Sequence, residues 1–376
     1  MRKFKVGVLG ATGMVGQRFL ALLENHSMFE VVVVAASGRS AGKRYETAVR
    51  WVMPTPMPPR IAELQLFDAA NVREVSEKVD FVFSAIGDNL TTVAELEKAY
   101  AKSHTPVVSN TAAHRKTQNV PVIIPEVNPE HIEIIAAQRR EFGTDRGFIV
   151  VKPSCSLQSY VPAIHPLMSL RPTRIAVALF VAASGAGLPD LPSDAAQKVS
   201  TPYTIGRWPE YLDNVIPLAR EEETKGEAEP LKIWGTIEGD AIVEADSPEI
   251  QAQFLRVPVT DGHTAAVFLS FAERTSKAEI VDRWNAFVGE PQRRMLPSAP
   301  LRFLIYNEAS ERPQVKEDLN AESGMAISIG HLREVTQHDY SFVALSHNTI
   351  RGAAGGAVLT AELLVDKGYI ERRSRS

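Results

Sequence analysis

Cysteine is almost absent from this sequence, which has one thiol, Cys155, in 376 residues. A single thiol excludes an internal disulfide and any zinc or iron–sulfur site built from several cysteines, and it is typical of a reducing compartment. A long apolar run is missing too, because the longest, residues 175–183, is far shorter than the about 20 residues of a membrane-spanning helix. We therefore expect a cytoplasmic globular protein without a membrane partner or a metal site.

The sequence also lacks an excess of either charge. Its 41 basic and 45 acidic residues leave a formal charge of −4, so nothing favours a nucleic-acid partner. Hydrophobic residues make up 44% of the chain, which is enough for large cores. At this length two domains are more usual than one.

Strand and helix patterns alternate in the first half. Continuous apolar strands that alternate with helices are typical of a parallel sheet covered on both faces. We predict a Rossmann-type, doubly wound α/β domain. Its strands are expected at 3–10, 30–37, 80–86, 105–110 and 120–127, and its helices at 15–26 and 92–102.

The turn "GATGMVG" (10–16) carries glycines at Gly10, Gly13 and Gly16. This G-x-x-G-x-x-G spacing is a variant of the dinucleotide fingerprint and lies between the first predicted strand and helix, where a pyrophosphate binds. The alternative is a tight turn that needs glycine only for packing. We favour nucleotide binding.

The loop "AASGRSAGKRY" (35–45) follows the second strand, where an NAD site usually has a carboxylate. It offers Ser37, Arg39 and Ser40 instead, with further basic residues at 43 and 44. Hydroxyls and cations are the ligands that a 2′-phosphate prefers. We predict NADP rather than NAD, against the alternative of a solvated basic loop.

The pattern changes after residue 152. Strands dominate, which predicts an α+β domain on a mixed or antiparallel sheet. We place the first domain at 1–152, completed by a returning C-terminal helix within 347–370, and the second domain at 153–346. The second-domain strands are expected within 174–184, 254–273, 301–308, 324–334 and 340–346.

Cys155 lies between an apolar run (148–151) and a predicted helix (157–170). A buried, inert thiol is the simpler interpretation. A thiol at the start of a helix, with Lys152 nearby, would instead be favoured as the thiolate. His263 is a candidate base, because a bend at residues 261–262 could aim it into one cleft with Arg256. From spacing alone a surface histidine is the favoured interpretation.

Several segments, in order, resemble the aspartate-β-semialdehyde dehydrogenase family, especially its archaeal/fungal-type branch. The resemblance covers almost the whole chain and implies NADP-dependent interconversion of an acyl phosphate and an aldehyde, with inorganic phosphate as a further small-molecule partner. It also implies a homodimer or homotetramer built on the second, catalytic domain. The matching segments are "GATGMVGQRF", "AASGRSAGKRY", "SNTAAHR", "VPVIIPEVN", the "CS" at 155, "SGAG", "LRVPVTDGH" and "NTIRGAAGGAV".

Individual roles follow from this resemblance. Cys155 matches the nucleophile that holds the thioacyl group, and His263 matches the acid/base, which would take the thiol proton. Arg256 matches the substrate-carboxylate ligand, Glu222 the amino-group ligand, and Lys225 with Arg115 the phosphate ligands, with Ser154 beside them. The cofactor residues implied are Gly10, Thr12, Gly13, Met14, Val15, Ser37, Arg39, Ser40, Ser84, Ala85, Ser184, Gly185, Asn348 and Gly352.

Three features depart from the family pattern. Ser154 replaces an asparagine before the cysteine, and Val181 falls where members carry a glutamine, so that Gln158 is the nearest possible substitute. The segment 188–207 is longer than usual and either reshapes the pocket or is a harmless insertion. These departures leave open a paralogue that reduces another activated acyl group, such as an acyl-CoA, and, less favoured, a non-catalytic NADP-binding protein.

Overall fold

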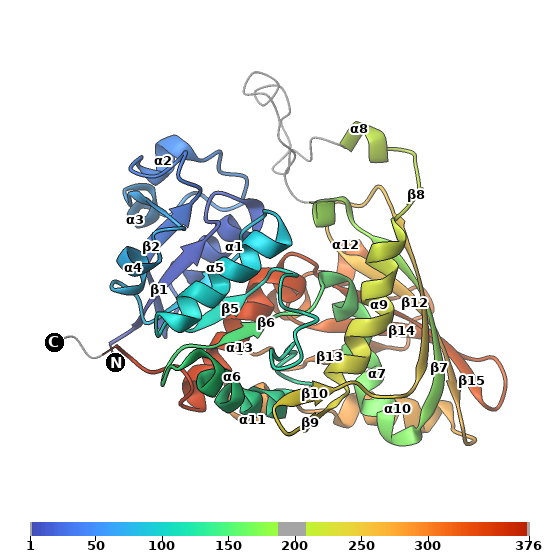
Figure 1. Cartoon of the computed structure of the whole chain (residues 1–376). Helices are drawn as coiled ribbons and strands as arrows, with labels where there is room; N and C mark the ends of the chain where they lie inside the picture. Colours follow the sequence, from blue (N-terminus) through green and yellow to red (C-terminus); the bar gives the residue numbers. More distant parts are fainter. Residues whose placement is uncertain (1, 187–207, 374–376) are drawn as a thin grey trace.

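Two sheets organise the chain, and each belongs to one half of the molecule (Figure 1). The computed structural model describes residues 2–186 and 208–373. The predicted loop at 188–207 and Gly187 therefore lie outside the described residues.

The first sheet has six strands in the order β3-β2-β1-β4-β5-β6, and all its neighbouring pairs are parallel. Its central strands are apolar and almost fully buried, as expected for a sheet covered on both faces. The strands are β1 (Phe4–Leu9), β2 (Phe29–Ala36), β3 (Leu66–Asp68), β4 (Phe81–Ser84), β5 (Val107–Ser109) and β6 (Ile149–Val151).

Helices cover both faces of this sheet. Phe19 and Leu20 of α1 (Met14–Leu23) share one core with Ala357 and Leu364 of α13 (Gly355–Asp366). The C-terminal helix thus packs on the first sheet. The opposite face is covered by α4 (Val72–Ser76) and α5 (Leu90–Lys102), and α6 (Ile135–Phe142) lies near β6.

The second sheet has seven strands in the order β13-β14-β15-β12-β7-β11-β8 and is mixed. β7 pairs parallel with β11 and antiparallel with β12, and β13 pairs parallel with β14. The strands are β7 (Pro172–Val181), β8 (Ile216–Pro217), β11 (Glu249–Arg256), β12 (His263–Phe271), β13 (Leu304–Asn307), β14 (Ile327–Glu334) and β15 (Asp339–Ser346).

Alternation along β7 and β12 separates two faces of this sheet. Val177 and Val267 point into the core, which also takes Trp284 from α10 (Lys277–Ala286). On the other face Phe180 is 36% exposed and Phe268 is 50% exposed. α9 (Arg220–Ile233) lies along β11, so closely that a Cβ on Gly226 would lie 2.5 Å from the Phe254 ring.

The remaining elements are short. They are α2 (Tyr45–Ala48), α3 (Pro59–Ala62), η1 (Pro129–Ile134), η2 (Cys155–Ser159), α7 (Val161–Ile164), η3 (His165–Leu170), η4 (Ala183–Ala186), α8 (Trp208–Tyr211), the hairpin β9 (Thr236–Glu238) and β10 (Ala241–Val243), α11 (Glu290–Arg293), α12 (Val315–Asp318), η6 (Ala321–Gly324) and the π-turn η7 (Ile350–Ala354).

The expected fold class, a parallel α/β sheet joined to a second domain with a mixed sheet, is confirmed. Two local predictions are wrong. Residues 120–127 form no strand and make only an isolated bridge between Val122 and Val151. The helix predicted at 157–170 is broken into η2, α7 and η3, because Pro162 and Pro166 lack the amide that a continuous helix requires. The boundary at 152/153 stays a prediction.

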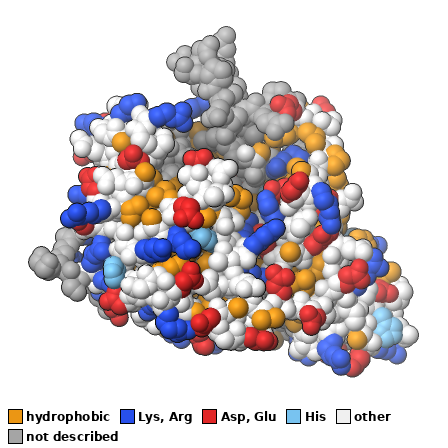
Figure 2. Space-filling view, viewed as in Figure 1, with side chains coloured by type: hydrophobic (Ala, Val, Ile, Leu, Met, Phe, Trp, Pro, Cys, Tyr) orange, Lys and Arg blue, Asp and Glu red, His pale blue; other side chains and the backbone are white. Residues whose placement is uncertain are grey.

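Acidic and basic side chains are interspersed over the face of the molecule seen in Figure 2. In the described part of the chain no helix is long and apolar enough to cross a membrane. Nor do residues 2–186 and 208–373 contain a group of three or more acidic, histidine or cysteine side chains that could hold a metal ion.

Candidate active site

The single cysteine meets a buried histidine. Cys155 opens η2 and is partly exposed, and its Sγ lies 3.4 Å from Nε2 of His263, the first residue of β12. His263 has no exposed surface. The inert, buried thiol considered above therefore does not describe Cys155.

The backbone of one residue, Ala182, contacts both candidate residues of the 255–263 segment. The N–H of Ala182 donates to Nδ1 of His263 at 3.1 Å, and the C=O of Ala182 accepts from Arg256 Nη1 at 2.6 Å. Arg256 also lies over the ring of Tyr211, with 5.9 Å to the ring centroid. The two side chains are thus brought to the same residue, as the predicted bend requires.

The same contacts define the protonation of His263. Because Nδ1 accepts a hydrogen bond from a backbone amide, the neutral ring carries its proton on Nε2, which faces the sulfur. Burial, and to a smaller extent the charge of Arg256, lower the pKa of His263 to about 3. His263 is neutral at physiological pH and presents an N–H donor to the thiol.

Glu229 links the cysteine loop to a predicted phosphate ligand. Its Oε2 accepts from the Ser154 amide at 2.8 Å, and its Oε1 accepts from Arg115 Nη1 at 3.1 Å. The Arg115 side chain is 11% exposed and that of Glu229 is 8% exposed. Arg115 is therefore held next to Cys155 by a carboxylate of α9.

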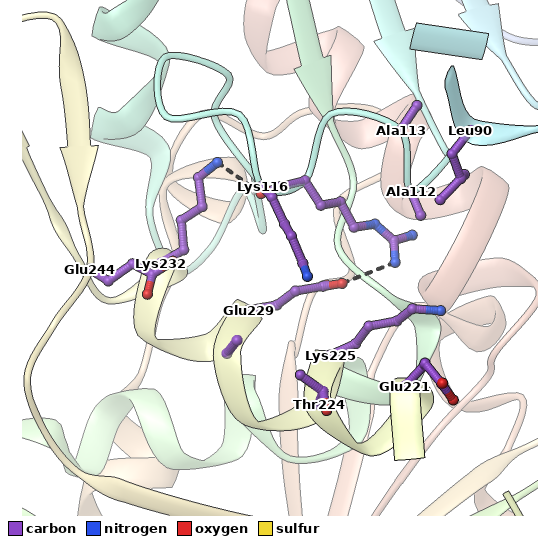
Figure 3. A pocket seen from close by; sticks show the side chains of 12 residues that line it. Leu90, Ala112, Ala113, Lys116, Glu221, Thr224, Lys225, Glu229, Lys232 and Glu244 are labelled. Carbon is purple, nitrogen blue, oxygen red and sulfur yellow. Dashed lines mark hydrogen bonds and ion pairs between the residues drawn. The ribbon is translucent and has the colours of Figure 1, made fainter. Parts of the chain in front are cut away.

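A cavity of about 360 Å³ opens between α9 and the loop around Arg115. In Figure 3, Lys225, Glu229 and Lys232 extend from α9, while Ala112, Ala113 and Lys116 lie on the loop across the cavity. Three glutamates, Glu221, Glu229 and Glu244, line this space together with four basic side chains, which could bind an anion once their ion pairs open. The four basic side chains are Arg115, Lys116, Lys225 and Lys232.

Glu222 and Lys225 lie on one face of α9 and pair with each other, with Nζ 2.5 Å from Oε1. Lys225 lines the cavity, whereas Glu222 lies beside it. Both side chains keep between 31 and 42% of their surface exposed, so the pair can open toward a ligand. The separate roles predicted for the two residues stay predictions.

The glycine turn has the shape that a dinucleotide needs. Gly10 has φ +77°, and a Cβ there would lie 2.4 Å from the Ala85 carbonyl oxygen, so only glycine fits between β1 and the end of β4. Gly13 caps α1 without a side-chain hydrogen bond. The first amides of α1, from Met14 and Val15, are available to a phosphate. Thr12 lies in the same turn, and its C=O accepts from Gln17.

The predicted 2′-phosphate loop is solvent-facing. Ser37 and Arg39 are exposed, Ser40 is partly exposed, and the Ser40 amide donates to the Ser37 C=O. Asp68, at the end of β3, comes close to this loop, since a Cβ on Gly38 would lie 2.9 Å from its Oδ2. Sequence reasoning missed this carboxylate because only the strand pairing of β2 with β3 brings it there.

Two of the predicted cofactor residues form a buried network with Asp261. Ser184 Oγ donates to Asp261 Oδ1 and accepts from Asn348 Nδ2, both at 2.7 Å. The Gly262 amide donates to Asn348 Oδ1 at 2.8 Å. This network secures the bend that leads into His263. Ser84 has no exposed surface and lies against Glu97, so its side chain points away from the turn.

Gly352 lies against Cys155, and Gly185 lies against His263. A Cβ on Gly352 would lie 2.9 Å from the Cys155 Cβ, so the π-turn backs directly onto the thiol loop. A Cβ on Gly185 would lie 3.2 Å from His263 Cε1. At both positions the lack of a side chain lets the backbone approach Cys155 and His263 closely.

The departures from the family pattern have structural descriptions. Val181 is 3% exposed and joins the core of the second domain at the end of β7. Gln158 accepts from Arg351 Nε at 3.1 Å and is not directed at the thiol. The Ser154 amide, rather than its side chain, makes the contact with Glu229.

Sequence reasoning missed several residues of the site. Glu229 is spaced seven residues after Glu222 and four after Lys225, which places all three on one helical face, and this spacing could have identified it. Arg351 is fully buried and forms a two-pronged ion pair with Glu126 at 2.9 and 2.5 Å. No local sequence signal marks that pair, because its partners lie 225 residues apart.

Known proteins resemble this chain over its full length. The family model described as "Semialdehyde dehydrogenase, NAD binding domain" matches residues 5–135, and "Semialdehyde dehydrogenase, dimerisation domain" matches residues 164–351. The aspartate-semialdehyde dehydrogenase of Archaeoglobus fulgidus is 38% identical over 98% of this chain and 100% of its own length. That of Aspergillus fumigatus is 38% identical over 98% of this chain and 99% of its own.

Solved structures agree. The crystal structure of aspartate semialdehyde dehydrogenase with NADP from Candida albicans superposes with a TM-score of 0.83, at 31% identity, over 98% of this chain and 100% of that chain. A Vibrio cholerae structure of aspartate semialdehyde dehydrogenase II reaches a TM-score of 0.71 at 22% identity, over 98% of this chain and 100% of that chain, and supports the fold alone.

Glu229→Gln should destabilise the protein. The amide can still accept from Ser154, but Arg115 loses its ionic partner in a nearly buried position, which costs about 1–3 kcal/mol. Urea unfolding measures the change. Glu221→Gln, an exposed glutamate on the same helix and cavity, is the control and should stay within about 0.5 kcal/mol. Equal stabilities of the two variants would contradict the bridging role of Glu229.

Proposed function

This chain belongs to the aspartate-semialdehyde dehydrogenase family, and we propose how its residues divide the work of an NADP-dependent aspartate-semialdehyde dehydrogenase. The enzyme reversibly reduces L-aspartyl-4-phosphate to the 4-semialdehyde and phosphate. The contact between Cys155 Sγ and His263 Nε2 carries the assignment of roles, and Glu229, which lines the cavity, binds the amide of the residue before Cys155. The full-length relatives do not favour the acyl-CoA alternative.

The residues of the first domain fit NADP. The cradle at Gly10, which a Cβ would fill, and the amides at the start of α1 suit the pyrophosphate. Ser37, Arg39 and Ser40 would hold the 2′-phosphate. When bound, NADPH supplies a hydride. The reacting end would lie near Gly185 and Gly352, whose lack of side chains leaves room beside Cys155 and His263.

Charged groups position the substrate. Arg256 is directed at the α-carboxylate, and Arg115 with Lys225 at the phosphate, since guanidinium and ammonium groups are strong ligands for these anions. Glu222 would receive the α-amino group once its contact with Lys225 opens. Fixed cations around the phosphate also stabilise the charge on it as it leaves.

Cys155 carries the covalent step. Its thiolate attacks the acyl carbon, the C–O bond to phosphate breaks, and a thioester forms on sulfur. The thioester carbon accepts a hydride, and the hemithioacetal then collapses with loss of the C–S bond to give the aldehyde and restore the thiolate. The His263 Nε2–H donates to the oxygen that becomes negative in these steps, which lowers both barriers.

We further propose a homo-oligomer, either a dimer or a tetramer, built on the outer face of the second sheet. The family model of this region is a dimerisation domain. Phe180 and Phe268 lie on adjacent strands of this face and are the exposed aromatic residues of β7 and β12. A cytoplasmic location, as expected from the single thiol, belongs to the same proposal.

Cys155→Ser should abolish turnover and leave NADP binding unchanged, because the serine hydroxyl stays protonated at neutral pH and is a far weaker nucleophile than a thiolate. The assay follows NADPH absorbance with NADP⁺, phosphate and a panel of aldehydes that includes aspartate semialdehyde. Iodoacetamide should inactivate the wild type with one label per chain. A fully active serine variant would overturn the assignment of the nucleophile. A preference for another aldehyde would overturn the assignment of aspartate semialdehyde as the substrate.

Arg39→Ala should weaken NADP binding about tenfold, which corresponds to about 1.4 kcal/mol, and leave NAD binding unchanged. The reason is the loss of one exposed charge-assisted contact to the 2′-phosphate. Calorimetry with both cofactors measures this. Arg44→Ala is the control, since Arg44 lies in the same loop but pairs with Glu46 at 2.8 Å. A wild type that binds NADP and NAD equally would refute the proposal that this loop binds the 2′-phosphate.

Phe268→Asp should dissociate the oligomer, because a carboxylate would be buried against the partner's apolar face. Sedimentation velocity at micromolar concentration should give at least a dimer for the wild type and a monomer for the variant. Val288→Asp, at an exposed valine after α10 on the other side of the domain, should leave the wild-type state. A monomeric wild type would exclude this interface.

A further inference from the structure

The loop that carries Arg115 is tied to α5 of the first domain. The hydroxyls of Ser109 and Thr111 both donate to Oε1 of Glu97, at 2.7 and 3.2 Å, and Glu97 has no exposed surface. The ring of His114 donates from Nε2 to a backbone C=O of the same helix at 3.1 Å. These contacts hold the part of the loop that precedes Arg115.

Lys232 of α9 connects the same loop to the second domain. Its Nζ donates to the C=O of Arg115 at 2.9 Å and to the C=O of Thr117 at 2.6 Å. In Figure 3 the Lys232 side chain runs from α9 to the loop across the cavity, and a dashed line marks this contact. Lys232 is 4% exposed, and the two carbonyl groups offset the cost of burying its ammonium. One side chain thus fastens the turn that begins at Arg115.

One face of α9 holds both the side chain and the main chain of Arg115. The spacing of Lys225, Glu229 and Lys232 places them on one helical face, and all three line the cavity. Glu229 accepts from Arg115 Nη1 at 3.1 Å, whereas Lys232 binds the C=O of Arg115. The position of the guanidinium in the cavity therefore depends on two neighbouring turns of the same helix.

The two contacts respond differently to an anion in the cavity. A phosphate competes with Glu229 for the guanidinium, because a phosphate and a carboxylate bind the same N–H groups. The contact of Lys232 uses only the backbone oxygen of Arg115, so an anion on the guanidinium does not displace it. When the ion pair between Glu229 and Arg115 opens, the main chain of Arg115 is still held by Lys232.

Lys232 keeps its charge at neutral pH. Burial lowers its pKa to about 8, while the charges of Glu244 and Glu229 oppose this change. An ammonium has three N–H donors, so it binds both carbonyl groups at once. The hydrogen bonds to Arg115 and Thr117 are therefore charge-assisted, which makes them stronger than hydrogen bonds from a neutral donor.

We propose that Lys232 is a positioning residue of the phosphate site, which holds the main chain of Arg115 while the guanidinium turns from Glu229 to the anion. The inference rests on the proposed function, because it takes Arg115 as a phosphate ligand. Lys232 does not contact the reacting atoms in this scheme and acts only through Arg115. Its loss should therefore weaken the binding of phosphate and leave the binding of the aldehyde and of NADP unchanged.

The test is Lys232→Met, which removes the ammonium and keeps the length of the side chain. In the NADP⁺-dependent oxidation of aspartate semialdehyde the KM for inorganic phosphate should rise about tenfold, because Arg115 is no longer held in position. The KM for the aldehyde and the Kd of NADP should stay within about twofold of the wild-type values. An unchanged KM for phosphate, or an equal rise in the KM for the aldehyde, would overturn the positioning role.

A direct contact between Lys232 and phosphate is the alternative, and a double-mutant cycle with Arg115→Met separates the two. If Lys232 acts through Arg115, adding Lys232→Met to Arg115→Met should raise the KM for phosphate by less than about twofold. If Lys232 binds phosphate itself, the second substitution should again raise this KM about tenfold, which would overturn the proposal.

Ile280→Ala is the control for a general loss of stability. Ile280 is 1% exposed and lies in the core of the second domain, so its truncation should lower the urea midpoint and leave the KM for phosphate unchanged. If Lys232→Met is not recovered as folded protein, Lys232→Gln takes its place. The amide keeps N–H donors but loses the charge, so the KM for phosphate should rise at least about threefold, and no rise would contradict the proposal.

Thermal unfolding with added phosphate tests the same site without turnover. Phosphate that binds the native protein raises the Tm above that in chloride at the same ionic strength. The rise should be as small in Lys232→Met as in Arg115→Met, and a rise equal to that of the wild type would exclude the positioning role. A wild type that binds phosphate but does not oxidise aspartate semialdehyde would refute the proposed reaction, while this readout still decides the role of Lys232.

Discussion

The ion pair between Arg115 and Glu229 connects the two domains next to Ser154, the residue before Cys155. Arg115 comes from the loop after β5, and Glu229 comes from α9, which packs on the second sheet. The second carboxylate oxygen receives the Ser154 amide, so the conformation of the residue before Cys155 depends on the same group. The cavity and the candidate nucleophile are thereby connected through one side chain.

A second set of contacts holds His263, the residue that faces the thiol. The Ala182 peptide positions His263 and Arg256 together, and the Ser184–Asp261–Asn348 network fixes the bend between their strands. Gly352 packs against Cys155, and it belongs to the segment that returns to the first sheet. The site is thus assembled from both domains, which explains why its residues are spread over most of the chain.

The parts of the fold that repeat a simple pattern could be predicted from the sequence. The buried strands of the first sheet, the turn at Gly10 and the returning C-terminal helix all follow from apolar periodicity and glycine spacing. The strand predicted at 120–127 failed because apolar composition does not specify a hydrogen-bonding partner, and only Val122 finds one. The helix after Cys155 failed because its prolines were given too little weight against an apolar run.

The candidate site could be predicted only where a residue acts alone. Cys155 is found by being the sole cysteine, and His263 by the turn beside it. Arg351 and the Ala182 backbone act through partners more than 70 residues away, and no local pattern encodes such pairings. Glu229 shares a helical face with Glu222 and Lys225, but that spacing does not reveal its partners Arg115 and Ser154. The helix-dipole argument for the thiolate also lost its basis, because η2 is a single short 3₁₀ turn.

The loss of that helix changes which groups can stabilise a negative sulfur. Within the described site the buried cations fall into two classes: Arg115 and Arg351 are neutralised by Glu229 and Glu126, whereas Lys152 meets only a neutral carbonyl. A neutralised arginine organises its surroundings but adds little net field at the sulfur, since its carboxylate cancels most of its charge. Burial lowers the pKa of Lys152 to about 7, so its charge is only partly present near neutral pH, and the neutral His263 directs its Nε2–H at the sulfur.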